Sequence, residues 1–90
     1  MGQWHMITFS FAKAPKVTEL QPVFDQQAED WLRLNVHTWL AYSNLTSAQW
    51  YEVLRLHLTQ DDSVLVMRLD ATEYFGWEPE WVWNKIQKKR

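Results

Sequence analysis

Cysteine is absent from this 90-residue chain, so disulfide bonds and thiolate metal sites are excluded. Glycine occurs only at Gly2 and Gly76, which leaves no glycine-rich loop for phosphate. No stretch approaches the roughly 18 apolar residues that a membrane-spanning helix requires. Residues 1–5 lack the features of a secretory signal and could be a leader ahead of a native start at Met6. We therefore expect a cytoplasmic protein that does not associate with membranes.

Aromatic residues, by contrast, are abundant, and seven of them are tryptophan. A chain of this length supports one core and therefore a single domain over residues 1–90. Each buried aromatic side chain removes roughly 150–250 Å² from water, so seven tryptophans exceed what one small core is expected to hide. Some should line a groove or a self-association surface. The alternative is a core with a few half-exposed rings.

The first half of the chain predicts a strand followed by a helix. Residues 6–11 alternate between apolar and polar side chains, as in a half-buried strand. Apolar residues then recur at helical spacing as far as Trp31. This helix begins either at Thr18, with Gln21 as a capping-box partner, or at Pro22, because proline suits a first turn.

A hairpin, a helix and a strand are predicted next. Residues 32–35 and 38–43 favour two short strands joined by a tight turn, with one long strand as the competing interpretation. Thr46 is the clearest helix start, with Gln49 as its capping-box partner. Residues 64–69 form a nearly continuous apolar run, which is typical of a central strand.

This order predicts an α+β domain of the ferredoxin-like βαββαβ type, a four-stranded antiparallel sheet with two helices on one face. The other face is left open to solvent, a partner or a second copy. Residues 71–90 form an aromatic C-terminal extension with a basic tail, free to pack on a neighbour or to fold back. Helices on both faces, or a single helix over residues 32–43, would contradict this arrangement.

Five aromatic residues crowd into positions 74–83 of this extension, where Pro79 suits the first position of a short helix. The three tryptophans there cannot all lie on one face of that helix. Because aromatic anchors dominate the energetics of interfaces, we expect this segment to bind a second copy or another protein. The expected interface residues are Phe75, Trp77, Trp81 and Trp83.

Nucleic acid is a further candidate partner, although the net charge of −2 and the pI of about 5.8 do not favour it. Arg68 lies in the last predicted strand and either pairs with an acid or faces the open side of the sheet. On that side, Trp39 or Tyr42 could complete a platform for single-stranded nucleic acid. The candidate nucleic-acid-binding residues are Arg68, Lys85, Lys88, Lys89 and Arg90.

Metal-ligand signals are weak, and we expect no cofactor. Asp61 and Asp62 are adjacent in a predicted turn and are the candidate metal ligands, because carboxylates suit Mg²⁺. A turn and strand-start role is the favoured alternative for both, and for Asp70. The three histidines do not have the spacing of a zinc site.

Three stretches resemble one family: MITFSFA from Met6, TWLAYSNLTSAQWYEVL from Thr38, and DDSVLVMRLDATEYFGWEPEWVW from Asp61. They are similar to the SinR-like proteins, relatives of the second core CRISPR-associated protein (Cas-two-like) and of the VapD toxins. The resemblance implies a ferredoxin-like protomer, a homodimer and, in nuclease members, an acidic metal ligand at the end of the first strand. The matching position here is Ala12.

Three functions are therefore open. The preferred hypothesis is a non-enzymatic dimerising interaction module on this scaffold, without the metal ligand. One alternative is a Mg²⁺-dependent nuclease for RNA or DNA that uses Asp61, Asp62 or Asp70. The other is a nucleic-acid-binding protein without catalysis.

Overall fold

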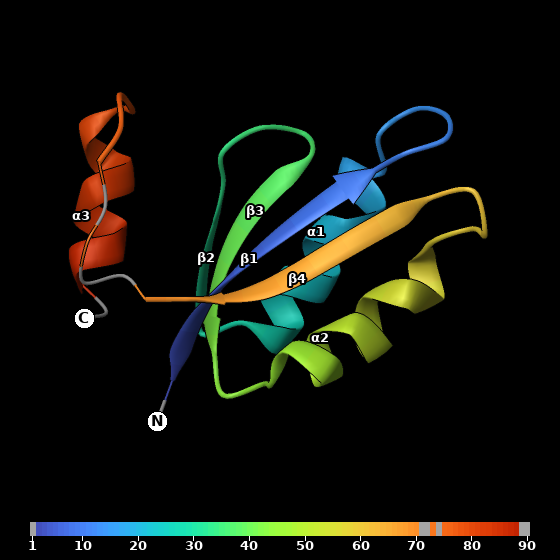
Figure 1. The fold of residues 1–90 in the computed structure, drawn as a ribbon, viewed down its shortest axis with the longest axis horizontal. Helices are drawn as coiled ribbons and strands as arrows, with labels where there is room; N and C mark the ends of the chain where they lie inside the picture. The colour runs from blue at the N-terminus through green and yellow to red at the C-terminus, as the bar shows by residue number, and fades with distance from the viewer. Residues whose placement is uncertain (1, 71–72, 74, 89–90) are drawn as a thin grey trace.

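The computed structural model describes residues 2–70, 73 and 75–88, which form one four-stranded sheet with helices on both of its faces (Figure 1). In chain order the elements are β1 (Gln3–Ser10), α1 (Val17–Gln27), β2 (Asp30–Arg33), β3 (Thr38–Ser43), α2 (Ser47–Leu54), the short 3₁₀ helix η1 (Arg55–His57), β4 (Ser63–Leu69) and α3 (Glu80–Lys88). None of the described helices is long and apolar enough to cross a bilayer.

The strands lie in the order β2-β3-β1-β4, and every neighbouring pair is antiparallel. The α+β class and the four-stranded antiparallel sheet are therefore confirmed. The hairpin is also confirmed, because β2 and β3 are separate strands, although β2 lies at Asp30–Arg33 and not at the predicted residues 32–35. Its turn is closed by Asn35, whose side-chain oxygen accepts hydrogen bonds from the backbone N–H groups of His37 (2.8 Å) and Thr38 (2.9 Å).

The first strand begins earlier than its alternating pattern predicts. β1 starts at Gln3, opposite Ser43 of β3, so residues 3–5 of the suggested leader belong to the sheet. The side chains of Trp4 and His5 are both buried. Met1 lies outside the described residues.

β4 is an edge strand, so the prediction of a central position was wrong. It pairs with β1 on one side only. Val64 and Val66 pack against the core beneath α1 and α2, whereas Leu65 and Met67 lie at alternate positions that face the other side of the sheet and are half-exposed. The run is apolar because both faces of β4 carry apolar side chains. It does not indicate that β4 lies between two other strands.

The two predicted helix starts had different outcomes. α2 begins with the predicted capping box: the hydroxyl of Thr46 accepts from the N–H of Gln49 (3.1 Å), and the side chain of Gln49 accepts from the N–H of Thr46 (2.9 Å). The start predicted for α1 at Thr18 or Pro22 was wrong. Lys16 is the N-cap, without a side-chain cap, and Pro22 lies inside the helix.

This difference predicts unequal effects of two matched substitutions. Thr46→Ala removes a cap that satisfies a backbone N–H, and it should cost about 1 kcal/mol of unfolding free energy, or roughly 4–8 °C in Tm. Thr18→Ala should leave Tm almost unchanged, because Thr18 caps nothing. Thermal unfolding followed by circular dichroism measures both. Equal losses in the two variants would contradict the assignment of Thr46 as the cap.

α1 and α2 cover one face of the sheet and enclose the main core (Figure 1). An aromatic cluster occupies its centre: the ring of Phe24 stacks on Trp39 with centroids 4.4 Å apart and on Trp50 at 5.3 Å. Trp31, which the helical spacing had placed at the end of the helix, instead lies in β2 and packs beside Trp39. The main core is formed by Ile7, Phe9, Leu20, Val23, Phe24, Trp39, Ala41, Trp50 and Leu54.

The C-terminal helix packs on the opposite face, so the extension folds back onto its own sheet. Val82 and Ile86, one helical turn apart on α3, are buried against Trp4, Leu32 and Leu40. Helices therefore lie on both faces, contrary to the expected one-sided arrangement. The face predicted to be open is covered in part, along the side nearer β2.

Candidate functional site

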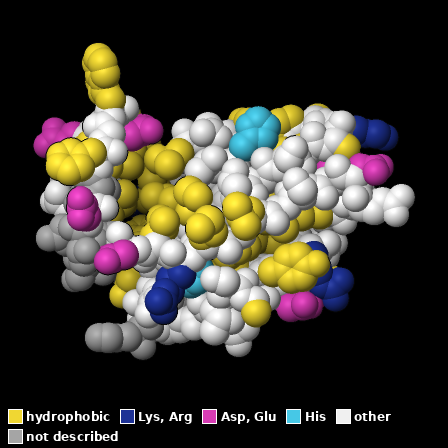
Figure 2. All heavy atoms as spheres, viewed as in Figure 1, with side chains coloured by type: hydrophobic (Ala, Val, Ile, Leu, Met, Phe, Trp, Pro, Cys, Tyr) yellow, Lys and Arg dark blue, Asp and Glu magenta, His cyan; other side chains and the backbone are white. Residues whose placement is uncertain are grey.

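The part of the sheet that α3 leaves uncovered, on the face where α3 packs, carries an apolar patch (Figure 2). β1 contributes Met6 to it, and β4 contributes Leu65 and Met67, because these residues occupy alternate positions on the same side of their strands. Leu65 and Met67 are both half-exposed. We call this area, made of Met6, Leu65 and Met67, the apolar face.

Polar contacts as well as apolar packing hold α3 beside this face. The ammonium group of Lys85 lies 3.0 Å from a carboxylate oxygen of Asp30 and donates a hydrogen bond to the carbonyl of Trp31 at 2.6 Å. These contacts fix the helix against β2, at the edge of the sheet remote from β4. The position of α3 therefore determines how much of the sheet is left uncovered.

Between α3 and the sheet lies a hollow of about 370 Å³. Sheet residues line one side of it, and the segment 75–78 that leads into α3 lines the other. The hollow opens beside the apolar face, since both include Met6. Its lining includes Met6, Leu34, Leu69, Trp77 and Trp83.

The four expected interface residues do not behave alike. Phe75 and Trp77 project from the segment before α3 and are essentially fully exposed, at 96 % and 101 %. Trp81, on α3, is half-exposed. Trp83 is partly buried and packs against the cluster that Trp4 forms with its neighbours between α3 and the sheet. It therefore contributes to the docking of α3. Phe75 and Trp77 are the strongest candidates for contacts with another molecule.

The three candidate nucleic-acid-binding residues that the structure describes, Arg68, Lys85 and Lys88, do not form one surface. Arg68 lies on β4 opposite His5 of β1 and therefore faces the side of α1 and α2, not the open side of the sheet. Lys85 is paired with Asp30 at the β2 edge. Lys88 is exposed at the end of α3, and Lys89 and Arg90 lie outside the described residues.

The suggested aromatic platform beside Arg68 is also absent. Trp39 is fully buried in the main core, where the guanidinium of Arg33 lies 5.8 Å from its ring centroid. Tyr42 occupies the opposite face of the sheet, next to Trp4. Neither ring lies on a surface that Arg68 shares.

Asp62 has a structural role in the turn before β4. Its carboxylate accepts hydrogen bonds from the Lys16 ammonium (2.8 Å), the N–H of Ala12 (2.8 Å) and both the N–H (2.9 Å) and hydroxyl of Thr59. The side chain is only 2 % exposed. The Lys16 ammonium, helped by the N–H groups of Thr59 and Ala12, holds the pKa of Asp62 well below its usual range. This carboxylate joins the loop after β1 to the loop after η1.

No arrangement among the described residues resembles a metal site. In that part of the chain, no group of three or more His, Cys, Asp or Glu side chains could hold an ion. Ala12, in the loop after β1, donates its backbone N–H to the carboxylate of Asp62. Asp61, which precedes Asp62 in the turn, is exposed, and Asp70 lies at the other end of β4.

Comparison with known proteins adds no assignment to this geometry. No family model, curated protein or solved structure matches the chain. The candidate site therefore rests on its own residues: Phe75 and Trp77, the hollow beside them and the apolar face.

Sequence reasoning missed the contribution of Leu65 and Met67 to this site. The signal was present, because a strand that is apolar at nearly every position has two apolar faces, and only one of them can lie beneath α1 and α2. A second group of residues, the polar side chains of Gln3, His5, Ser43, Ser47 and Arg68 that line a pocket at the start of α2, gave no comparable signal. They come from three separate segments of the chain that only the fold brings together.

Proposed function

We propose that this chain is a non-enzymatic interaction module that forms a homodimer through Phe75, Trp77 and the apolar face. The observation that carries the proposal is the complete exposure of two large aromatic side chains beside a half-exposed apolar sheet surface. Monomeric proteins rarely leave contiguous apolar area of this kind in water, so its presence favours a partner.

A second copy is the favoured partner, because each protomer carries both halves of a complementary contact. The rings of Phe75 and Trp77 project from the surface, and a hollow lined by Met6, Leu34 and Leu69 lies beside them. In a two-fold dimer the same patch serves on both subunits. The rings of one protomer would cover the apolar face and hollow of the other.

The available area fits a dimer of modest size. Two fully exposed aromatic side chains supply roughly 300–500 Å² per protomer. A standard stable interface buries about 800 Å² per partner. Leu65, Met67 and Trp81 lie on the same side of the sheet or on α3 and supply further apolar surface.

A ferredoxin-like scaffold similar to the SinR-like and Cas-two-like family is consistent with this role. Without α3, the elements run β1-α1-β2-β3-α2-β4, and the sheet reads β4-β1-β3-β2 with all neighbours antiparallel. The resemblance implies a homodimer. Ala12 replaces the acidic metal ligand, and Asp62, the nearest carboxylate to it in the fold, is committed to Lys16 and three backbone or hydroxyl donors. These features favour assembly over cleavage.

Sedimentation velocity over a range of concentrations tests the proposal. We expect the chain to sediment as a dimer at micromolar concentration. A monomer at high micromolar concentration would contradict it. The nuclease alternative predicts cleavage of single-stranded RNA that EDTA abolishes, so an EDTA-sensitive activity of the purified protein would favour that function instead.

A further inference from the structure

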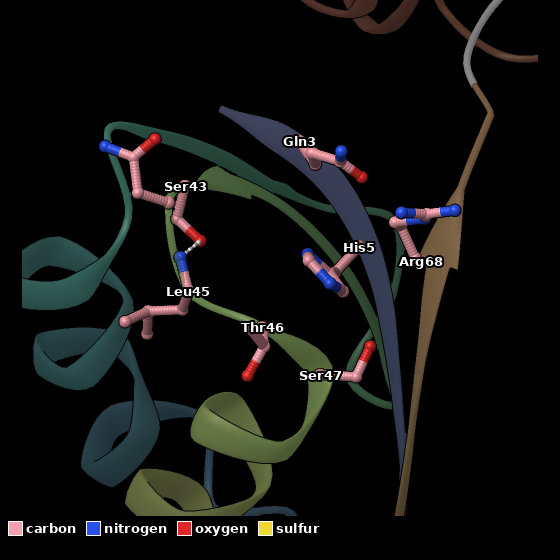
Figure 3. A pocket seen from close by; sticks show the side chains of 8 residues that line it. Gln3, His5, Ser43, Leu45, Thr46, Ser47 and Arg68 are labelled. Atoms are coloured by element: carbon pink, nitrogen blue, oxygen red, sulfur yellow. Dashed lines mark hydrogen bonds between the residues drawn. The ribbon is translucent and has the colours of Figure 1, made fainter. Parts of the chain in front are cut away.

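A polar pocket lies on the other face of the sheet, where β1, β4 and the start of α2 meet (Figure 3). Its volume is about 400 Å³, at the lower end of the range for small-molecule sites. Arg68 and His5 are the ionisable side chains that line it, and no acidic side chain does so. The lining residues are Gln3, His5, Ser43, Asn44, Leu45, Thr46, Ser47 and Arg68.

His5 is the most informative of these residues. It is only 2 % exposed, and its buried Nδ1 atom has no hydrogen-bond partner among the residues that the structure describes. Figure 3 shows its ring projecting from β1 into the space between that strand and the segment leading into α2. A buried polar nitrogen without a partner is costly, so its survival here points to a group that the pocket takes up.

Several other groups around the pocket can donate hydrogen bonds, and the side-chain amides of Gln3 and Asn44 can either donate or accept. The hydroxyl oxygen of Ser43 already accepts from the indole N–H of Trp50 (2.9 Å) and from the N–H of Leu45 (3.2 Å), so its own proton is left to donate. The capping box uses the N–H groups of Thr46 and Gln49. The N–H of Ser47, at the first position of α2, is left without an acceptor among the described residues, as is usual in a first helical turn.

Positive charge completes the site. The guanidinium of Arg68 extends from β4, directly opposite His5 in the β1–β4 register, and makes no ion pair with any described acidic residue. The N-terminus of α2 adds the positive end of the helix dipole. Burial lowers the pKa of His5, the backbone of Gln3 partly opposes this, and the charge of Arg68 lowers it further. The imidazole is therefore neutral at pH 7 and can donate from one ring nitrogen.

We infer that this pocket binds a phosphate group, held by the guanidinium of Arg68, the imidazole of His5, the hydroxyl of Ser43 and the N–H of Ser47. Donors without acceptors and positive charge without a counter-ion are the complement of a small tetrahedral oxyanion. The pocket is too small for a polymer to enter and suits inorganic phosphate or the phosphate of a mononucleotide. It lies on the face opposite the apolar face, so it is accessible in the monomer and in the proposed dimer.

Titration with inorganic phosphate, followed by ¹H–¹⁵N correlation spectra at constant ionic strength, tests the inference. Saturable shifts are expected at the N–H groups of Ser47 and Ala48 and at the imidazole of His5. Arg68→Gln should weaken binding at least about tenfold, because one charge-assisted hydrogen bond is lost. Arg55→Gln is the matched control: Arg55 is exposed at the far end of α2, pairs with Glu52, and should leave binding unchanged.

Two further ligands, adenosine 5′-monophosphate and sulfate, sharpen the result. Adenosine 5′-monophosphate binding at least as tightly as phosphate identifies the ligand as a phosphomonoester, and binding of phosphate alone identifies the free ion. Saturating sulfate, whose charge is constant over the titration range of histidine, should raise the pKa of His5, since an anion favours its protonated form. Shifts that do not saturate, or equal losses in Arg68→Gln and Arg55→Gln, would overturn the inference.

Discussion

Replacing Phe75 and Trp77 together with serine is expected to dissociate the proposed dimer. Buried aromatic anchors typically contribute at least about 2 kcal/mol each when truncated. The dissociation constant should therefore rise by at least about 100-fold. Both side chains are almost fully exposed in the protomer, so the double variant should retain its fold and its Tm at low concentration. Sedimentation equilibrium measures the shift directly.

Leu56→Ser provides the control for this experiment. Leu56 is a large, mostly exposed apolar residue on η1, away from α3 and the apolar face. Its replacement removes a comparable solvent-exposed apolar group and should leave the dissociation constant unchanged. If Leu56→Ser weakened association as much as the double variant, the interface would lie elsewhere. Met67→Ser, on the apolar face itself, should have an intermediate effect.

Trp39→Ala is expected to remove much of the stability of the domain. The Trp39 ring is fully buried and stacks on Phe24, with Phe9 meeting it edge-on and Trp31 beside it. Deleting a buried tryptophan costs about 3–5 kcal/mol. The total free energy of unfolding of a 90-residue domain is roughly 5–13 kcal/mol. Urea unfolding should therefore show a large decrease in the midpoint concentration. A loss of less than about 1 kcal/mol in the free energy of unfolding would contradict the central role of Trp39 in the core.

Two conservative variants separate packing from hydrogen bonding in this core. Trp39→Phe keeps an aromatic ring and removes an indole N–H that is buried without a partner, so it should cost about 1–2 kcal/mol at most. Trp50→Phe loses a similar volume and also the hydrogen bond to Ser43. It should be less stable than Trp39→Phe by about 1 kcal/mol. If Trp39→Phe were the less stable of the two variants, packing and not hydrogen bonding would determine the loss of stability.

Local signals in the sequence were sufficient for most of the secondary structure. The capping box at Thr46, the turn residues before Thr38 and the alternation in the first strand each depend on neighbours a few positions away, and each predicted its element. The start of α1 failed for a physical reason. Lys16 is the N-cap, and its side chain bonds to Asp62 and to the carbonyl of His57, which are distant in sequence.

The candidate site was predictable in part. The aromatic cluster predicted Phe75, Trp77, Trp81 and Trp83 alike as interface residues, because a small core cannot hide every ring, but it did not separate the exposed rings of Phe75 and Trp77 from Trp83, which packs within the protomer. The docking of α3 was not predictable, since it depends on the pairing of Lys85 with Asp30, 55 positions apart, and on apolar residues from three strands. The face of the sheet on which Arg68 lies could not be predicted either, because it depends on the register of β4 against β1.

The two free edges of the sheet are unequal in a way that bears on aggregation. At β2 the backbone of Trp31 is occupied: the Asp30 carboxylate accepts from its N–H (2.9 Å), and Lys85 donates to its carbonyl. Among the described residues, no strand pairs with the outer side of β4, a seven-residue, largely apolar strand whose one charged side chain is Arg68. Unpaired apolar edges are templates for further strands. Intermolecular sheet growth would therefore start at β4, with the charge of Arg68 opposing it.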